Sequence, residues 1–222
     1  MSYSDEKVLL AAKVAKAWLN KEALPWAALD RLKQAMMMRR HRRFARIGAD
    51  TTIFTEGQIE NPSGEAERIR IGERCGIRGH LFVFPHGGSI TIGDAVYIGA
   101  ETRIWSSAQL AIGDSVLISH QVNIMDTDGH SMDPTLREIH WEAIRTIGHP
   151  RSAQDIKAAP INIGDRAWIC AGATIMKGVN VGEGAVVASR SVVTKDVPGY
   201  KLVAGFPAEV VRDLSHLRYP AP

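Results

Sequence analysis

A six-residue period of aliphatic residues constrains the fold of this chain more than any other feature. In the C-terminal third, Ile or Val recurs at every sixth position, and a small or β-branched residue follows each one four places later. The two series are Ile163, Ile169, Ile175, Val181, Val187, Val193 and Ala167, Ala173, Val179, Ala185, Ser191, Val197. This period fits neither a 3.6-residue helix nor a hairpin meander with turns about every 8 to 12 residues.

The same period occurs earlier in the chain, which makes it a property of most of the sequence. The earlier sets are Ile71, Ile77, Val83; Ile92, Ile98, Ile104; and, shifted by two residues, Ile112, Ile118, Ile124. Such a period predicts a mainly β solenoid in which each flat face takes one short strand before the chain turns a corner. The aliphatic residues would point inward and stack at about 4.8 Å from coil to coil. Only 14 of the 222 residues are aromatic (Trp 5, Tyr 4, Phe 5), as expected for a narrow core of Ile and Val.

The two cysteines, Cys75 and Cys170, are too few to staple a scaffold of this size, which excludes a disulfide-rich secreted domain. Cys75 takes a small inward position after Ile71, so we expect a packed thiol, and Cys170 stands where glycine occurs in other repeats. No apolar run approaches the roughly 18 residues of a membrane span, and the N-terminus lacks a basic segment followed by an apolar one. These features predict a cytoplasmic protein.

The first 48 residues have a different composition, with nine alanines, six leucines and one isoleucine. This composition favours helices. We expect a first helix capped by Asp5, with Val8, Leu9, Ala12, Ala15 and Leu19 on one stripe, and a second that starts at Pro25 and carries Trp26, Leu29, Leu32 and Met36. The predicted organisation is a helical segment at 1–48, a β-helix at 49–212 with a loop at 131–160, and a tail at 213–222.

The formal charge of +3 is far from that of a dedicated nucleic-acid binder, and we predict no nucleic-acid partner. The positive excess is local, because removing five clustered arginines would change the charge from +3 to −2. The cluster consists of Arg39, Arg40, Arg42, Arg43 and Arg46. It is either a surface for an anionic acceptor or an acidic membrane, or simply a solvated helix end.

Two segments carry a resemblance to a known family. They are IGDRAWICAGATIMKGVNVGEGAVVASRSVVTKDVPGYKLVAGFPAEVVR, from Ile163 to Arg212, and ISHQVNIMDTDGH, from Ile118 to His130. Over about residues 70 to 212 the chain resembles the hexapeptide-repeat acyltransferases, and within them the maltose, nodulation and cell-surface polysaccharide O-acetyltransferases. The resemblance implies a left-handed parallel β-helix, a homotrimer with active sites between subunits, and acetyl-CoA as co-substrate without a metal.

The repeat stops after Gly129 and resumes at Ile161, and a loop this long in a compact solenoid is usually functional or disordered. His130 stands at its entrance, and the resemblance implies that this histidine is the general base that deprotonates the acceptor. Asp126 and Asp128 are candidates to orient the imidazole, with capping of their own turn as the alternative. Many family members have proline after this histidine, whereas this chain has Ser131.

The resemblance also implies a set of contacts with coenzyme A. Backbone groups of two residues would contact the pantetheine arm, and three further residues would lie near the adenosine phosphates. These positions are Ala171 and Ser189, and Thr194, Lys195 and Arg212. The two cations suit phosphates, although solvated surface charges are the alternative. Glu209 stands where some relatives have another arginine, so phosphate contacts would be fewer here.

The acceptor site is less legible from the sequence. Trp105, Trp141 and Tyr97 could stack on a sugar ring, and Glu101 could accept a bond from a sugar hydroxyl. Subunit packing is equally consistent with the sequence for the aromatic residues. For Glu101, solvation at the surface is the stronger alternative.

The predicted function is therefore acetyl transfer from acetyl-CoA to a hydroxyl of a sugar or cell-surface glycan precursor. An N-acetyltransferase of an amino sugar or nucleotide sugar is the alternative within the family. A γ-carbonic-anhydrase-like metal enzyme, with His80, His120 and His130 as ligands, is a rival on the same fold, although the ligand spacing of that family is absent. A solenoid scaffold that binds no coenzyme A is the non-enzymatic rival.

Overall fold

The computed structural model describes residues 25–152 and 155–218, with side chains from residue 31 onward. The first predicted helix, with Asp5, lies outside the described residues. The chain forms two compact units, Met1–Met37 and Met38–Pro222, and the strands that the structure describes all belong to the second. Helix α2 (Pro25–His41) occupies the second predicted helical segment.

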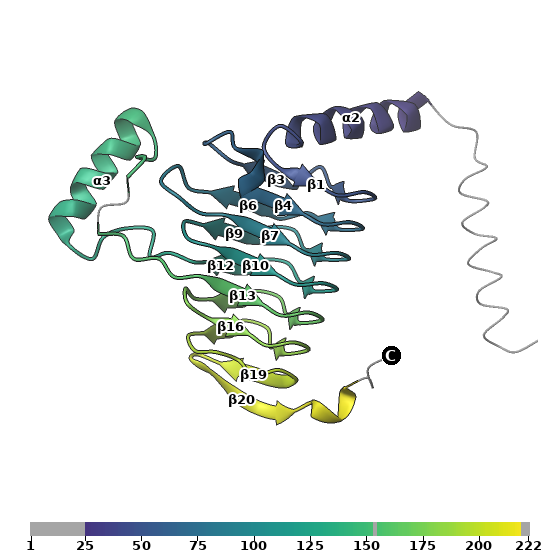
Figure 1. The fold of residues 1–222 in the computed structure, drawn as a ribbon, viewed down its shortest axis with the longest axis vertical. Helices are drawn as coiled ribbons and strands as arrows, with labels where there is room; N and C mark the ends of the chain where they lie inside the picture. The colour runs from purple at the N-terminus through teal and green to yellow at the C-terminus, as the bar shows by residue number, and fades with distance from the viewer. Residues whose placement is uncertain (1–24, 153–154, 219–222) are drawn as a thin grey trace, which may run out of the picture. The chain divides into compact units, whose positions relative to one another are not determined.

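Three parallel sheets form the walls of a prism, and the chain passes through all three in each coil (Figure 1). We name them sheets A, B and C in the order of passage, and the edges between them the A–B, B–C and C–A edges. Sheet A contains β1 (Arg46–Ile47), β4 (Ile69–Ile71), β7 (Ile90–Ile92), β10 (Leu110–Ile112), β13 (Ile161–Ile163) and β16 (Asn180–Val181). Sheet B contains β2 (Thr52–Ile53), β5 (Gly76–Ile77), β8 (Tyr97–Ile98), β11 (Leu117–Ile118), β14 (Trp168–Ile169), β17 (Val186–Val187), β19 (Lys201–Gly205) and β20 (Ala208–Asp213). Sheet C contains β3 (Gln58–Glu60), β6 (His80–Val83), β9 (Arg103–Ser106), β12 (Asn123–Met125), β15 (Thr174–Ile175) and β18 (Val192–Val193).

The six-residue series forms the core, as predicted. In sheet B, Ile118 pairs in register with Ile98 on one side and Ile169 on the other, and all three side chains are fully buried. The residues four places later, such as Ala173 and Ala185, are also fully buried. Each such isoleucine contributes about 1.5–3 kcal/mol through burial, so the prism is stabilised by many equal increments. Cys75 is buried in this core, as expected.

The first coil begins before the predicted boundary at residue 49. Strand β1 starts at Arg46, and Ile47, Ile53 and Ile59 are buried at successive six-residue intervals. This series lies partly inside the alanine- and leucine-rich segment, whose composition masked it. A short 3-10 helix (Ala66–Arg68) then leads into the next coil.

The segment predicted as a loop at 131–160 contains helix α3 (Pro134–Ile147), which lies to one side of the coil stack (Figure 1). Asp133 caps the helix by accepting bonds from the N–H groups of Thr135 and Leu136, and Pro134 occupies its first turn. Both are ordinary helix-start signals. The six-residue period carries no trace of this helix, because its residues follow a different spacing.

An antiparallel pair closes the C-terminal end of the prism. Strand β19 adds to β17, and β20 folds back on β19, ending one residue beyond the predicted domain boundary at 212. A 3-10 helix (Ser215–Leu217) follows. Among the described helices, none has the length and apolar character that crossing a membrane requires.

Candidate active site

The insertion that carries His130 leaves the prism at the C–A edge through a hydrogen-bonded neck. Thr127 forms an antiparallel bridge with Ala158, and the N–H of Asp128 donates to the carbonyl of Lys157 at 2.9 Å. The N–H of Ala159 donates to the carbonyl of Asp126, also at 2.9 Å. The neck therefore fixes the position at which the insertion starts and returns.

Asp126 is fully buried and holds a turn of the neighbouring coil. Its carboxylate accepts bonds from the Ser106 hydroxyl (2.6 Å) and from the N–H groups of Ser107 (2.7 Å) and Ala108 (3.0 Å). Burial raises the pKa of this carboxyl, and the bonds from Ser106, Ser107 and Ala108 counteract the rise. Asp126 therefore fixes a turn of the coil scaffold, and its orienting role toward His130 stays a prediction.

Asp128 makes an ion pair at the same edge. Its Oδ1 lies 2.5 Å from Nζ of Lys177, and the carboxylate side chain is 13% exposed. Lys177 follows β15, so this pair joins the neck to the next coil. The contact fixes the base of the insertion, and the expected orienting contact with His130 does not occur among the described residues of one chain.

His130 has an exposed side chain, and its imidazole contacts a histidine that sequence reasoning left without a role. Nδ1 of His130 lies 3.1 Å from Nδ1 of His140, and the ring centroids are 5.0 Å apart in an edge-on arrangement. His140 belongs to α3, ten residues further along the chain. The spacing offers no obvious signal for this contact, because it depends on how α3 folds back.

Ser131, which replaces the family's proline, is buried and organises the loop after His130. Its hydroxyl donates to Oδ2 of Asp155 at 2.6 Å and accepts the N–H of Asp133 at 3.0 Å. The Arg137 guanidinium in turn donates to the Ser131 carbonyl at 3.0 Å. Hydrogen bonds therefore replace the conformational restriction that a proline would supply at this position.

An aromatic cluster covers part of the outer face of sheet C beneath the end of the insertion. Phe82, Phe84 and Trp105 contact one another edge-on, and His149 packs on both phenylalanines at centroid distances of 5.8 and 5.7 Å. His86 stacks on Phe84 at 5.2 Å. Trp105 is therefore a packing residue in this chain, and its indole N–H donates to Nδ1 of His80 at 3.3 Å.

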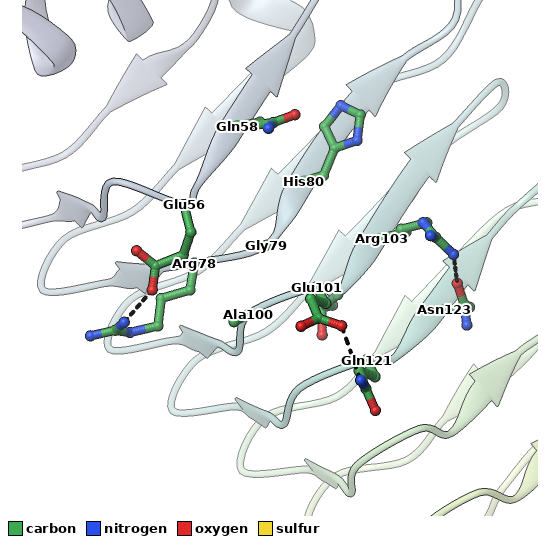
Figure 2. Close-up of a pocket in the computed structure, with 11 residues that line it drawn as sticks. Glu56, Gln58, Arg78, Gly79, His80, Ala100, Glu101, Arg103, Gln121 and Asn123 are labelled. Atoms are coloured by element: carbon green, nitrogen blue, oxygen red, sulfur yellow. Dashed lines mark hydrogen bonds and ion pairs between the residues drawn. The ribbon is translucent and has the colours of Figure 1, made fainter.

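A polar groove of about 730 Å³ runs along the B–C edge of the N-terminal coils (Figure 2). Three polar pairs along the groove join side chains of neighbouring coils. They are Arg78 with Glu56, Gln121 with Glu101 (2.9 Å), and Arg103 with Asn123 (3.4 Å). The lining residues are Glu56, Gln58, Arg78, Gly79, His80, Ala100, Glu101, Thr102, Arg103, Gln121 and Asn123. Of these, the sequence analysis singled out Glu101 for an acceptor and His80 only as a ligand of the rival metal enzyme. The other lining residues escaped it because outward-facing positions vary from coil to coil.

Two of the predicted coenzyme A positions lie on this same edge. Along it, the N–H of Gln121 donates to Ala100, that of Gly172 to His120, and that of Arg190 to Ala171, each from one coil to the preceding one. The strand registers place Ser189 at the position equivalent to Ala171 in the next coil. The two residues predicted to contact the pantetheine arm therefore lie on the same edge as the polar groove, in the coils that follow it.

The remaining coenzyme A positions lie elsewhere on the prism. Thr194 and Lys195 follow β18 toward the C–A edge, and Arg212 lies on β20. Nζ of Lys195 lies 3.9 Å from Oε1 of Glu209, with both side chains more than two-thirds exposed. The coenzyme A contacts of Thr194, Lys195 and Arg212 stay predictions.

Other predicted residues are dispersed over the surface. Trp141 is 55% exposed on α3, and Tyr97 is 38% exposed on β8. In the arginine cluster, Arg46 pairs with Glu67 at 2.6 Å and Arg42 donates to the Ile47 carbonyl at 2.8 Å. No group of three or more His, Cys, Asp or Glu side chains within 25–152 and 155–218 is arranged to hold a metal, including the set His80, His120 and His130.

Three parallel sheets coiled with a period of six define a parallel β-helix as the fold that carries this site, and the likeness to a solved hexapeptide-repeat acetyltransferase supports the predicted left-handed form. A family model described as bacterial transferase hexapeptide (six repeats) matches residues 160–195. The chain therefore carries the repeat of the bacterial hexapeptide transferase family, and the proteins similar to it in sequence and in structure include acetyltransferases of that family.

Relatives with assigned names fall in the same family. The chain is 30% identical to galactoside O-acetyltransferase of Escherichia coli over 65% of this chain and 64% of the relative. It is 26% identical to the protein of the same name from Lactococcus lactis, over 73% of each. The chain spans less than two thirds of several relatives that it matches, including proteins of Mycobacterium tuberculosis (64%) and Saccharomyces cerevisiae (61%).

Solved structures support the fold. A hexapeptide-repeat acetyltransferase of Vibrio cholerae, complexed with acetyl-CoA, has a TM-score of 0.55 at 23% identity and covers 96% of this chain and 90% of its own. AntD, an N-acyltransferase of Bacillus cereus in complex with dTDP and coenzyme A, has a TM-score of 0.62 at 21% identity, over 81% of this chain and 89% of its own.

Proposed function

We propose that this protein transfers the acetyl group of acetyl-CoA to a hydroxyl of a sugar or glycan precursor, with His130 as general base. The observation that carries the proposal is the state of His130. Its side chain is exposed at the start of the insertion and is hydrogen-bonded through Nδ1, so that Nε2 is the nitrogen directed to a substrate. The galactoside O-acetyltransferases among the relatives support a sugar hydroxyl as the acceptor.

The chemistry requires no covalent enzyme intermediate. Nε2 of His130 takes the proton of the acceptor hydroxyl as its oxygen attacks the thioester carbonyl. The C–S bond then breaks, and the departing thiolate takes the proton from the imidazolium, giving coenzyme A and the O-acetyl product. Holding both substrates together supplies much of the rate, because a bimolecular reaction becomes effectively intramolecular.

We infer that the acceptor occupies the polar groove and that the pantetheine arm follows the B–C edge past Ala171 and Ser189. The groove presents carboxylates, amides and guanidinium groups, which suit sugar hydroxyls. His130 starts from the C–A edge of its own prism. The proposal therefore includes a homotrimer in which the insertion of one subunit brings His130 to the B–C edge of another, in a cytoplasmic setting that keeps Cys75 and Cys170 as thiols.

The direct test is release of free thiol from acetyl-CoA with a panel of sugars, nucleotide sugars and oligosaccharides, comparing the wild type with His130→Ala. We expect turnover by the wild type and a loss of about 10²–10⁴-fold in the variant, with coenzyme A binding by calorimetry unchanged. Arg145→Ala, an exposed change on α3, is the matched control. Full turnover by His130→Ala would remove His130 as base, and turnover only with amino sugars would establish the N-acetyl alternative.

The shared site has its own test. Ala171→Trp places a bulky side chain on the B–C edge. It should block the binding of coenzyme A to the edge of the substituted subunit. Coexpression of His130→Ala and Ala171→Trp chains under two affinity tags should restore part of the activity in the doubly tagged oligomer. No restoration in a verified mixed oligomer would place the whole site within one chain.

A further inference from the structure

The contact between His130 and His140 limits the protonation states of both rings. Each ring has one nitrogen in the contact, Nδ1 in both cases, at a separation of 3.1 Å. Two neutral imidazoles form such a bond only if one nitrogen carries a proton and the other offers a lone pair. The bond is lost when both carry protons. The contact therefore couples the tautomer of His130 to that of His140.

His140 is held where it can select a tautomer. It lies on α3, whose start is fixed by the Asp133 cap, and Arg137 ties the helix back to the Ser131 carbonyl. The Nε2 atom of His140 is buried and has no hydrogen-bond partner within the described residues. Because buried polar atoms are usually paired, this ring is a costly choice for packing alone.

The surroundings of His140 favour a neutral ring. Burial lowers its pKa, and the neighbouring His130, His149 and His86 lower it further. No carboxylate contributes to this shift. A neutral partner can accept a bond from an imidazolium without adding a charge of its own, whereas a protonated partner would repel it.

We propose that His140 is the positioning residue for His130, accepting the Nδ1–H of His130 on its own Nδ1 and so directing the Nε2 lone pair of His130 to the acceptor. This inference rests on the proposed function and deepens it. When Nε2 takes the proton from the acceptor hydroxyl, both nitrogens of His130 carry protons, and Nδ1–H still has its acceptor. Throughout this step His140 remains neutral and keeps its own proton on the buried Nε2. In this site a neutral histidine takes the place of the carboxylate that commonly orients a catalytic histidine.

Kinetics with two substitutions test the role. His140→Ala removes the acceptor, whereas His140→Asn retains a carbonyl oxygen at a position that corresponds to Nδ1. We expect kcat to fall about 10–100-fold in His140→Ala with the KM for acetyl-CoA changed less than about twofold, and to recover to within about threefold of wild type in His140→Asn. Arg145→Ala controls for disturbance of α3, and circular dichroism verifies folding.

Nitrogen NMR of histidine-labelled protein tests the tautomer without substrate, with the His130 signals assigned from His130→Ala. We expect the wild type to show His130 with the proton on Nδ1, and His140→Ala to show a mixture of tautomers. The proposal is overturned if His130 carries its proton on Nε2, if His140→Ala retains kcat within twofold, or if His140→Asn is as impaired as His140→Ala. If the wild type has no transferase activity, the proposed function fails, and the NMR result still decides the contact.

Discussion

The coiled prism and the insertion at 126–160 are stabilised in different ways. In the prism, every coil adds fully buried aliphatic residues in register with those of its neighbours, as Ile98, Ile118 and Ile169 do. Helix α3 has no buried residue, and the insertion is fixed by single contacts such as the Asp133 cap and the Ser131–Asp155 bond. The comparison shows that the repeat supplies most of the stability of the molecule. The irregular insertion contributes little to stability and is the part that carries functional residues.

The largest effect should come from breaking the stack. Ile169→Ala removes a fully buried side chain between Ile118 and Val187, and we expect a loss of about 2–5 kcal/mol in the free energy of unfolding. The matching substitution in the insertion is Ile147→Ala, because Ile147 is 81% exposed on α3. It should change the free energy of unfolding by less than about 0.5 kcal/mol. Denaturant unfolding of both variants decides the matter. Equal losses would contradict the comparison.

A second substitution tests whether Asp126 stabilises the prism or serves only the insertion that begins beside it. Asp126→Ala leaves the Ser107 and Ala108 N–H groups without their acceptor, and leaves the Ser106 hydroxyl only the Ser89 carbonyl. We expect destabilisation by about 2–4 kcal/mol, because unpaired buried donors cost about 1–3 kcal/mol each and relaxation recovers part of that. Thermal unfolding measures it. A variant of wild-type stability with lost activity would instead return Asp126 to an orienting role.

A smaller effect is expected inside the insertion. Asp133→Ala removes the cap of α3, which costs about 0.5–2 kcal/mol of helix stability. Because α3 lacks a buried face, the loss should appear as faster hydrogen exchange within 134–147, while the exchange of the coil strands is unchanged. Asp133→Ser, which retains a capping oxygen, should restore protection. Faster exchange throughout the prism would show that the two regions unfold together.

The smallest expected effect is a dependence of stability on pH. Burial lowers the pKa of His41, His80, His86 and His140, so the unfolded chain binds protons more readily than the folded one. Stability should therefore be complete above about pH 6.5 and fall as the pH decreases below that value. The raised pKa of Asp126 acts in the opposite sense. Melting temperatures at pH 7.5 and 5.5 test this, and His86→Phe, which retains the stack on Phe84, should reduce the difference.

The coils could be predicted because their signal is local and repeated. Once Ile163 and its successors define the period, the inward direction of Ile104 or Ile124 follows without knowledge of distant contacts. The same period marks the first coil through Ile47, Ile53 and Ile59, although the coil starts within the alanine- and leucine-rich segment. Helix α3 was missed although Asp133 and Pro134 mark its start.

The site was predictable only at single positions. The motif ending at His130 predicts a base at that position, and this stays a prediction. Asp126 and Asp128 bond to Ser106 and Lys177, which are distant in sequence. The polar groove combines corner residues from successive coils, such as Glu56, Glu101 and Gln121, whose identities follow no period. Corner side chains face outward, so packing in the core does not restrict them.

The sequence by itself determined the solenoid, its inward residues and the place where it is interrupted, because a six-residue period permits one way to bury its aliphatic face. Only the tertiary structure decided which groups meet at the interruption. The contact of His130 with His140 arises from the return of a capped helix, and the position of Ala171 below the groove arises from coil stacking. Such contacts join residues through folding geometry rather than spacing, and no local pattern records them.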